Sequence, residues 1–75
     1  MEYYKEALKI DREIGNKEGE ARQLGNIGII YVGKSDKEKP LNYFKQALEI
    51  FKQIGAKKEI EVIEKWIKSL SDAST

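Results

Sequence analysis

The fold is decided by residues 24–54, LGNIGIIYVGKSDKEKPLNYFKQALEIFKQI. In the first part of this stretch, large apolar residues recur at steps of three and four, as along one face of an α-helix: Leu24, Ile27, Ile30 and Tyr31. Gly25 and Gly28 lie on the same side of that helix. Glycine inside a helix costs about 1 kcal/mol relative to alanine, so this pair predicts a neighbouring helix packed closely against the backbone.

A short polar connection separates this helix from a second one. Gly33-Lys34-Ser35-Asp36 is typical of a helix stop followed by capping residues. The second helix carries an apolar face at helical spacing, formed by Tyr43, Phe44, Ala47, Leu48, Phe51 and Ile54. The two helices are therefore expected to form an antiparallel hairpin.

The start of the second helix depends on Pro40. Ser35 and Glu38 have the spacing of a capping box, which would start the helix near Asp36. Pro40 would then lie in the second turn, although proline lacks an amide hydrogen and fits only in the first turn. The alternative is that the regular helix begins at Pro40. In both cases the turn between Asp36 and Leu41 is expected to be bent or loosened.

The chain also repeats itself with a period of 40 residues. Residues 3–10, YYKEALKI, correspond to residues 43–50, YFKQALEI, and Ile14-Gly15 then falls on Ile54-Gly55. Periods of this length are typical of arrays in which each helical unit buries its apolar face on its neighbours.

These residues resemble the tetratricopeptide repeat, in a long variety of about 40 residues rather than the usual ~34. The match rests on Leu24-Gly25-Asn26-Ile27-Gly28 and Tyr31, then on Tyr43-Phe44, Ala47-Leu48 and Ile54-Gly55. It covers residues 2–55 well and the remainder loosely. Two positions depart from the family pattern, because Pro40 stands where an alanine is usual and Ser35 replaces the common turn glycine.

The resemblance implies an all-α protein, a right-handed array of four antiparallel helices that equals about one and a half repeat units. We expect one domain over residues 1–70, followed by a disordered tail over residues 71–75. The expected helices span about 2–14, 17–33, 37–54 and 57–70. Gly15 is expected to end the first helix and Asn16 to cap the second.

The last helix has the pattern of a terminal cap. Its apolar face consists of Ile60, Ile63, Trp66, Ile67 and Leu70. Its other face is charged, with Glu61, Glu64, Lys65 and Lys68. A shift of 39 residues matches this helix to the one before the turn and places Ile67 on Gly28. We interpret it as a solvating end helix, and the alternative is that it packs on another copy of the chain.

The first helix has no partner of its own kind in the chain. By the 40-residue match it is the second helix of a repeat whose first helix is missing, so we expect a fragment, a truncated form or half of an assembly. Its expected buried stripe consists of Tyr4, Ala7, Leu8 and Ile14. Without a covering helix, the candidates for exposed apolar surface are Tyr3, Tyr4 and Ile10.

Composition argues against catalysis. The 75 residues include no histidine and no cysteine, the commonest general base, metal ligands and soft nucleophile. The carboxylates lie among lysines on expected solvent faces, and Gly25-Asn26-Ile27-Gly28 follows no strand, so it is not a phosphate loop. We therefore expect no enzyme, no catalytic residue, no cofactor and no metal site.

Charge and hydropathy limit the partners further. The net charge of +1 is too small for a nucleic-acid surface. Lysines do gather at two turns, expected at the same end of the hairpin, but acidic residues interleave with them: Lys34, Lys37, Lys39, Lys57 and Lys58. No apolar run is long enough to span a membrane, and the N-terminus lacks the apolar core of a signal peptide. Together with the absence of cysteine, this predicts a cytoplasmic protein without nucleic-acid or membrane partners.

Binding of a protein or peptide is the expected function. Tetratricopeptide repeat proteins bind extended peptides or helices in a concave groove lined by the first helix of each repeat. The positions expected to face that groove here are Arg22, Gly25, Asn26, Ile29, Val32 and Gly33. Asn26 matches an asparagine with which relatives hydrogen-bond a peptide backbone, since an amide both donates and accepts. A second such asparagine is replaced here by Ile29.

Self-association into a homo-oligomer is the alternative function. Ile29 and Val32 would form a small apolar patch beside two glycines, and the first helix lacks a cover. One repeat also offers less surface than the roughly 800 Å² per partner that specific interfaces bury. Two copies could supply each other's missing neighbour by packing, or by exchanging helices about a hinge near Pro40.

Overall fold

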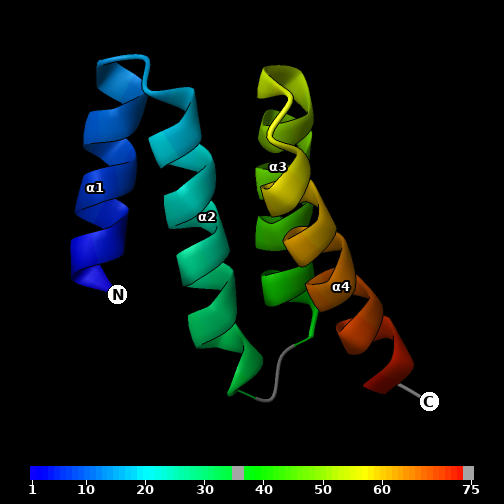
Figure 1. The fold of residues 1–75 in the computed structure, drawn as a ribbon. Coiled ribbons are helices and arrows are strands. Elements are labelled where there is room, and N and C mark those ends of the chain that lie inside the picture. Colours follow the sequence, from blue (N-terminus) through cyan, green and yellow to red (C-terminus); the bar gives the residue numbers. More distant parts are fainter. Residues whose placement is uncertain (35–36, 74–75) are drawn as a thin grey trace.

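The computed structural model describes residues 1–34 and 37–73, which form four α-helices and no strand. The helices are α1 (Glu2–Glu13), α2 (Lys17–Val32), α3 (Glu38–Ile54) and α4 (Lys57–Ala73). Consecutive helices run antiparallel and pack side by side (Figure 1). The expected all-α array of four antiparallel helices is confirmed.

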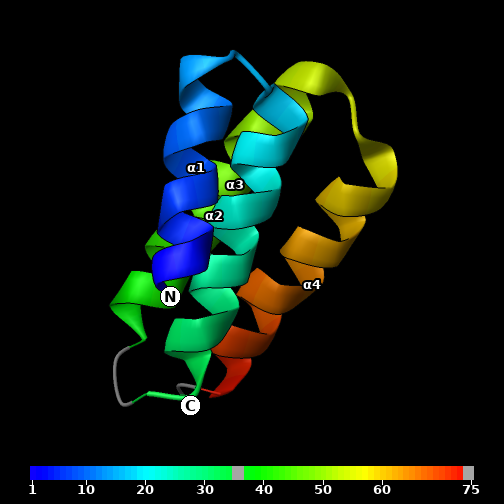
Figure 2. The same ribbon diagram turned by 90° about the vertical axis from the view of Figure 1, so that its left-hand side faces the viewer.

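The helices build a flat molecule of 40 × 28 × 14 Å. Seen from the side, α1 and α3 lie along one edge and α4 along the other, with α2 between them (Figure 2). The centre of the molecule is the contact between α2 and α3, while α1 packs mainly on α2 and α4 mainly on α3. Two of the four helices are therefore covered by a neighbour on one side only.

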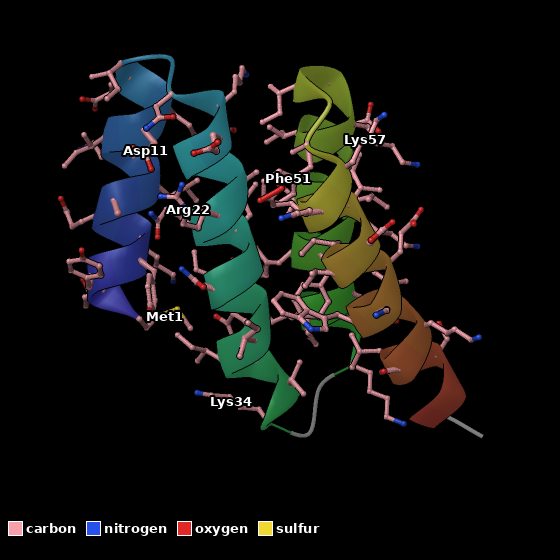
Figure 3. The ribbon with its side chains drawn as sticks, in the orientation of Figure 1. Met1, Asp11, Arg22, Lys34, Phe51 and Lys57 are labelled. Atoms are coloured by element: carbon pink, nitrogen blue, oxygen red, sulfur yellow. The ribbon has the colours of Figure 1, made fainter. Side chains whose placement is uncertain are left out.

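The turn between α1 and α2 is built as the sequence predicts. Gly15 has a φ of +73°, in the left-handed region that favours glycine. Asn16 caps α2, and its side-chain oxygen accepts a hydrogen bond from the Gly19 backbone N–H at 3.0 Å. Gly19 also allows a close approach that the sequence did not reveal. A Cβ there would lie 2.6 Å from the Asp11 carboxylate, which lies beside the first turn of α2 (Figure 3).

α3 starts between the two alternatives considered for Pro40, one residue after the expected boundary at about residue 37. The helix begins at Glu38, so Pro40 is its third residue and lies in the first turn, with its side chain fully buried. The first four N–H groups of a helix have no partner inside the helix, so proline costs no hydrogen bond there. Leu41 is the next residue, and its N–H donates to the carbonyl of Lys37 at 3.3 Å. Ser35, on which the predicted capping box depends, lies outside the described residues.

The C-terminal helix is longer than expected. α4 continues through Ala73, three residues beyond the expected end at residue 70. The disordered tail expected over residues 71–75 therefore does not begin at residue 71, and residues 74–75 lie outside the described part. No glycine or proline occurs after Leu70 to stop the helix, and serine, aspartate and alanine can all extend one.

The core lies between α2 and α3 and extends to one residue each from α1 and α4. Its buried apolar side chains are Leu8, Ala21, Leu24, Ile27, Phe44, Ala47, Ile50, Phe51 and Ile63. The close helix contact predicted from the glycine pair is confirmed at Gly28, where a Cβ would lie 2.6 Å from the Phe44 ring. At Gly25 the nearest atoms, on Ile63 and Trp66, would be at 3.7 and 3.9 Å, an ordinary contact distance.

Two predictions of burial need correction. Ile14, expected in the buried stripe of α1, is 69% exposed, and Ile54, expected on the apolar face of α3, is 41% exposed. Each is the residue before a turn glycine, where the chain already leaves the neighbouring helix. Tyr4 is partly buried against the core, whereas Tyr3 and Ile10 are 76% and 51% exposed, as expected for an uncovered α1.

Candidate functional site

The five positions expected to bind a partner line a groove between α2 and α4. We call it the α2/α4 groove, and it consists of two cavities that share Trp66. The first, the Arg22 cavity, has a volume of about 200 Å³. It is lined by Ala21, Arg22, Gly25, Asn26, Phe51, Lys58, Glu59, Val62, Ile63 and Trp66.

The second cavity lies nearer the turn between α2 and α3. This Ile29 cavity has a volume of about 470 Å³. Among the described residues it is lined by Ile29, Val32, Phe44, Trp66, Ser69 and Leu70, a mostly apolar set in which Ser69 supplies a hydroxyl and Trp66 an indole N–H. Its volume falls within the about 300–1,000 Å³ of pockets that bind small molecules or side chains.

Aromatic packing fixes the width of the groove. The Phe44 ring fits against Gly28 of α2 and also meets the indole of Trp66, with ring centroids 5.4 Å apart and planes tilted by 47°. Ile63, one turn before Trp66, is only 3% exposed. These contacts hold α4 against α3 and leave one face of α2 uncovered along the groove.

The predicted residues contribute to the groove in different ways. Ile29 and Val32 are 45% and 46% exposed and supply apolar surface. Asn26 is partly buried, and Gly25 is buried beneath the α4 side chains. Gly33, which was expected to face the groove, is exposed at the end of α2 and lines neither cavity.

Charge is confined to the Arg22 end of the groove. Arg22 donates to the Glu18 carboxylate at 2.8 Å, and both side chains are largely exposed. Lys58 and Glu59 lie on the opposite wall. The groove thus changes from a charged end near the start of α2 to an apolar end near its last turn.

The wall formed by α4 was missed in the sequence. The sequence places Trp66 and Leu70 on the apolar face of an end helix but not in a partner groove, and it does not single out Val62, which is 43% exposed. The available signal was the spacing of Val62, Trp66 and Leu70 at four-residue steps, which places them on one face of α4. Periodicity shows that this face exists but not that it turns toward α2.

The two lysine-bearing turns lie at opposite ends of the molecule, contrary to expectation. Figure 3 shows Lys34 at one end and Lys57 at the other, because the whole length of α3 separates the turns. Within the part of the chain that the structure describes, no helix is long and apolar enough to cross a membrane. No group of three or more metal-ligating side chains gathers among the described residues.

Comparison with known proteins gives a partial match. No family model matches the chain, and no solved structure matches it significantly. The chain is similar to photosystem I assembly protein Ycf3 of Prochlorococcus marinus (strain NATL1A), with 40% identity over 48 residues. The matched stretch covers 64% of this chain but only 26% of the relative, so the chain spans far less than two thirds of the relative's length.

Proposed function

We propose that this chain is a protein-interaction module and that its α2/α4 groove holds a segment of a partner protein. One observation carries the proposal: the residues selected from the sequence as partner-binding lie along one groove, opposite apolar residues of a second helix. Ile29, Val32 and Val62 are each more than 40% exposed, so the groove presents apolar surface that a partner can remove from water.

The shape of the groove indicates the kind of segment. The Ile29 cavity accepts one or two large apolar side chains, because its lining offers them almost no hydrogen-bonding group. The Arg22 cavity places the Asn26 amide and the Arg22–Glu18 ion pair beside the same segment, where they can bind backbone or polar groups. A short segment with apolar residues at one end and polar residues at the other fits this arrangement.

The comparison supports protein partners rather than catalysis. The relative's name describes an assembly protein, and this chain contains neither histidine nor cysteine. We therefore propose that the chain is not an enzyme and needs no cofactor. Because the relative is named for photosystem I, segments of photosystem I subunits are the first ligands to test.

The proposal is tested with an array of overlapping 15-residue peptides that covers the photosystem I subunits, followed by titration of the strongest binder into the ¹⁵N-labelled chain. Chemical-shift changes are expected at Asn26, Ile29 and Val32. The double substitution I29S/V32S is expected to weaken binding by about tenfold or more, since it removes about 1.4 kcal/mol or more of apolar contact. It should barely change stability, because both side chains are already half exposed.

A matched control exists on another helix. Ile10 and Ile14 of α1 are more exposed than Ile29 and Val32 but lie outside the groove, so I10S/I14S should bind the same peptide with unchanged affinity. Equal loss of binding in both double variants would show that the peptide recognises exposed apolar surface in general. The groove would then have no specific role.

Self-association through the groove is the second candidate function. The same exposed residues, Ile29, Val32 and Val62, could be covered by another copy of the chain. Light scattering over a hundredfold range of concentration separates the two functions. A constant monomer mass favours a groove that is free for a partner, whereas a dimer that I29S/V32S dissociates would make self-assembly the function.

A further inference from the structure

Two helices of this molecule carry the same apolar stripe, but only one of the two stripes is covered along its middle. On α1 the stripe consists of Tyr3, Ala7, Ile10 and Ile14, which we call the α1 stripe. In the 40-residue repeat these positions correspond to four residues of α3, which we call the α3 stripe: Tyr43, Ala47, Ile50 and Ile54. On α3, Ala47 and Ile50 are 0% and 9% exposed, whereas Ile10 on α1 is 51% exposed.

The cover of the α3 stripe is provided by α2. The Tyr43 ring stacks on the Tyr31 ring, with centroids 5.7 Å apart and planes within 8° of parallel. The neighbouring Phe44 ring enters the space left by Gly28. α2 thus meets this surface with a glycine and, three residues later, a tyrosine.

We propose that the α1 stripe binds a partner helix with the surface chemistry of α2. Tyr4 of α1 corresponds to Phe44 of α3 in the repeat, so the partner helix would place a small residue opposite Tyr4, as α2 places Gly28 opposite Phe44. Three positions later it would place an aromatic residue opposite Tyr3, as α2 places Tyr31 opposite Tyr43. Tyr3 is 76% exposed and meets the Tyr4 ring edge to face, with centroids 5.5 Å apart, so a face of its ring can still stack on a partner. This interface is separate from the α2/α4 groove and does not depend on the function proposed for it.

Charge adds a further requirement on the partner. Glu2 and Glu6 are exposed beside the α1 stripe, where the repeat has Asn42 and Gln46 on α3. A basic residue near the aromatic position of the partner helix would therefore be favoured. α2 has this feature as well, since the Lys34 ammonium lies 5.8 Å from the centre of the Tyr31 ring.

The same features argue against a second copy as the occupant. If two α1 helices paired antiparallel through their stripes, neither would offer a glycine to the Tyr4 ring of the other, because Glu2–Glu13 contains none. The α4 helix of another copy is also a poor match, because Ile67 stands where α2 has Gly28 and leaves no space for the Tyr4 ring. The occupant is therefore a helix of another kind, with a small residue at that position.

A synthetic peptide of residues 16–34, NKEGEARQLGNIGIIYVGK, tests the proposal as the probe for such a helix. Titrated into the ¹⁵N-labelled 75-residue chain, it is expected to shift the amides of Tyr3, Ala7 and Ile10. A peptide carrying Gly28→Leu should bind about tenfold more weakly or not at all, because its side chain meets the Tyr4 ring.

Two double variants of the chain complete the test. I10S/I14S is expected to reduce peptide affinity by about tenfold while keeping the fold, because both side chains are more than half exposed. I29S/V32S, altered only in the α2/α4 groove, should bind the probe normally. Absence of binding, shifts centred on the groove, or exchange of the peptide for the chain's own α2 would each overturn the proposal. So would a dimer without peptide that I10S/I14S dissociates, since the occupant would then be a second copy.

Discussion

Two glycines of α2, three residues apart, meet different surroundings. A Cβ at Gly28 would lie 2.6 and 2.8 Å from two atoms of the Phe44 ring, which is itself only 1% exposed. A Cβ at Gly25 would lie 3.7 Å from Ile63, an ordinary contact. The sequence predicts both as packing glycines, because helical spacing shows which side they face. Spacing cannot show how closely the neighbour approaches, which depends on the ring of a residue in another helix.

Alanine substitutions should therefore have opposite effects at these two positions. Gly28→Ala is expected to destabilise the fold by about 1–2 kcal/mol, because displacing a buried ring costs more than the helix gains from alanine. Gly25→Ala is expected to stabilise it by about 0.5–1 kcal/mol, since it adds helix propensity and meets no clash. Urea denaturation followed by circular dichroism measures both. Stabilisation by both substitutions would show that Phe44 moves aside at little cost.

The ion pairs of Glu20 and Glu18 provide a second residue-level comparison. The Glu20 side chain is 12% exposed and lies 3.1 Å from Arg12 and 3.6 Å from Lys17. It ties the end of α1 to the start of α2, whereas the pair of Glu18 with Arg22 joins two side chains that are 66% and 59% exposed on one helix. Burial strengthens an ion pair that has good geometry, and exposure weakens it.

Glu20→Gln is accordingly expected to lower the free energy of unfolding by about 1 kcal/mol. The substitution removes the carboxylate charge that attracts both Arg12 and Lys17, and these two cations are about half exposed. Glu18→Gln, the matched control, should change it by less than about 0.5 kcal/mol. Urea denaturation at low and at high salt measures both variants. The difference between them should shrink at high salt, and an equal effect of the two substitutions would contradict the special role of Glu20.

At the scale of elements, periodicity predicts where helices lie but not which neighbours cover them. The ends of α1, α2 and α3 fall within one residue of the expected boundaries, because glycine and Asn16 mark the stops and starts. Ile14 and Ile54 nevertheless lie exposed, since the apolar stripe continues beyond the point where the chain turns away. In the groove, the α2 wall was predicted from the family resemblance. The α4 wall was not, because no local pattern fixes the orientation of that helix toward α2.

The attachment of α4 depends on Trp66, the one tryptophan of the chain. Its ring meets Phe44 at 5.4 Å and also forms part of both cavities of the groove. Trp66→Ala is expected to destabilise the protein by about 2–3 kcal/mol. This is less than the cost at a fully buried tryptophan, because Trp66 is only partly buried. The substitution should also release α4 from α3. Trp66→Phe keeps an aromatic pair and should cost less than about 1.5 kcal/mol. Circular dichroism and urea denaturation give both values, and equal costs would mean that the ring pair is not what holds α4.

At the scale of the whole molecule, the flat shape leaves the outer helices less secured than the inner ones. α2 and α3 contact each other and one outer helix each, whereas α1 and α4 contact one main neighbour. The thickness of 14 Å allows only a thin core, to which α1 contributes the buried side chain of Leu8 and α4 that of Ile63. Arrays of this kind behave as neighbouring units whose stability is a sum of local contacts, so opening should begin at the edges.

Hydrogen exchange followed by NMR should therefore divide the molecule into an inner and an outer pair of helices. Amides in the middle of α2 and α3 are expected to exchange only on global unfolding, whereas those of α1 and α4 should exchange at least about tenfold faster through local opening. If a peptide fills the α2/α4 groove, α4 should become protected while α1 stays unchanged. If the residue 16–34 peptide covers the α1 stripe, α1 should become protected instead. Uniform protection of all four helices in the free chain would contradict this picture, because it would require a core that couples the edges as tightly as the centre.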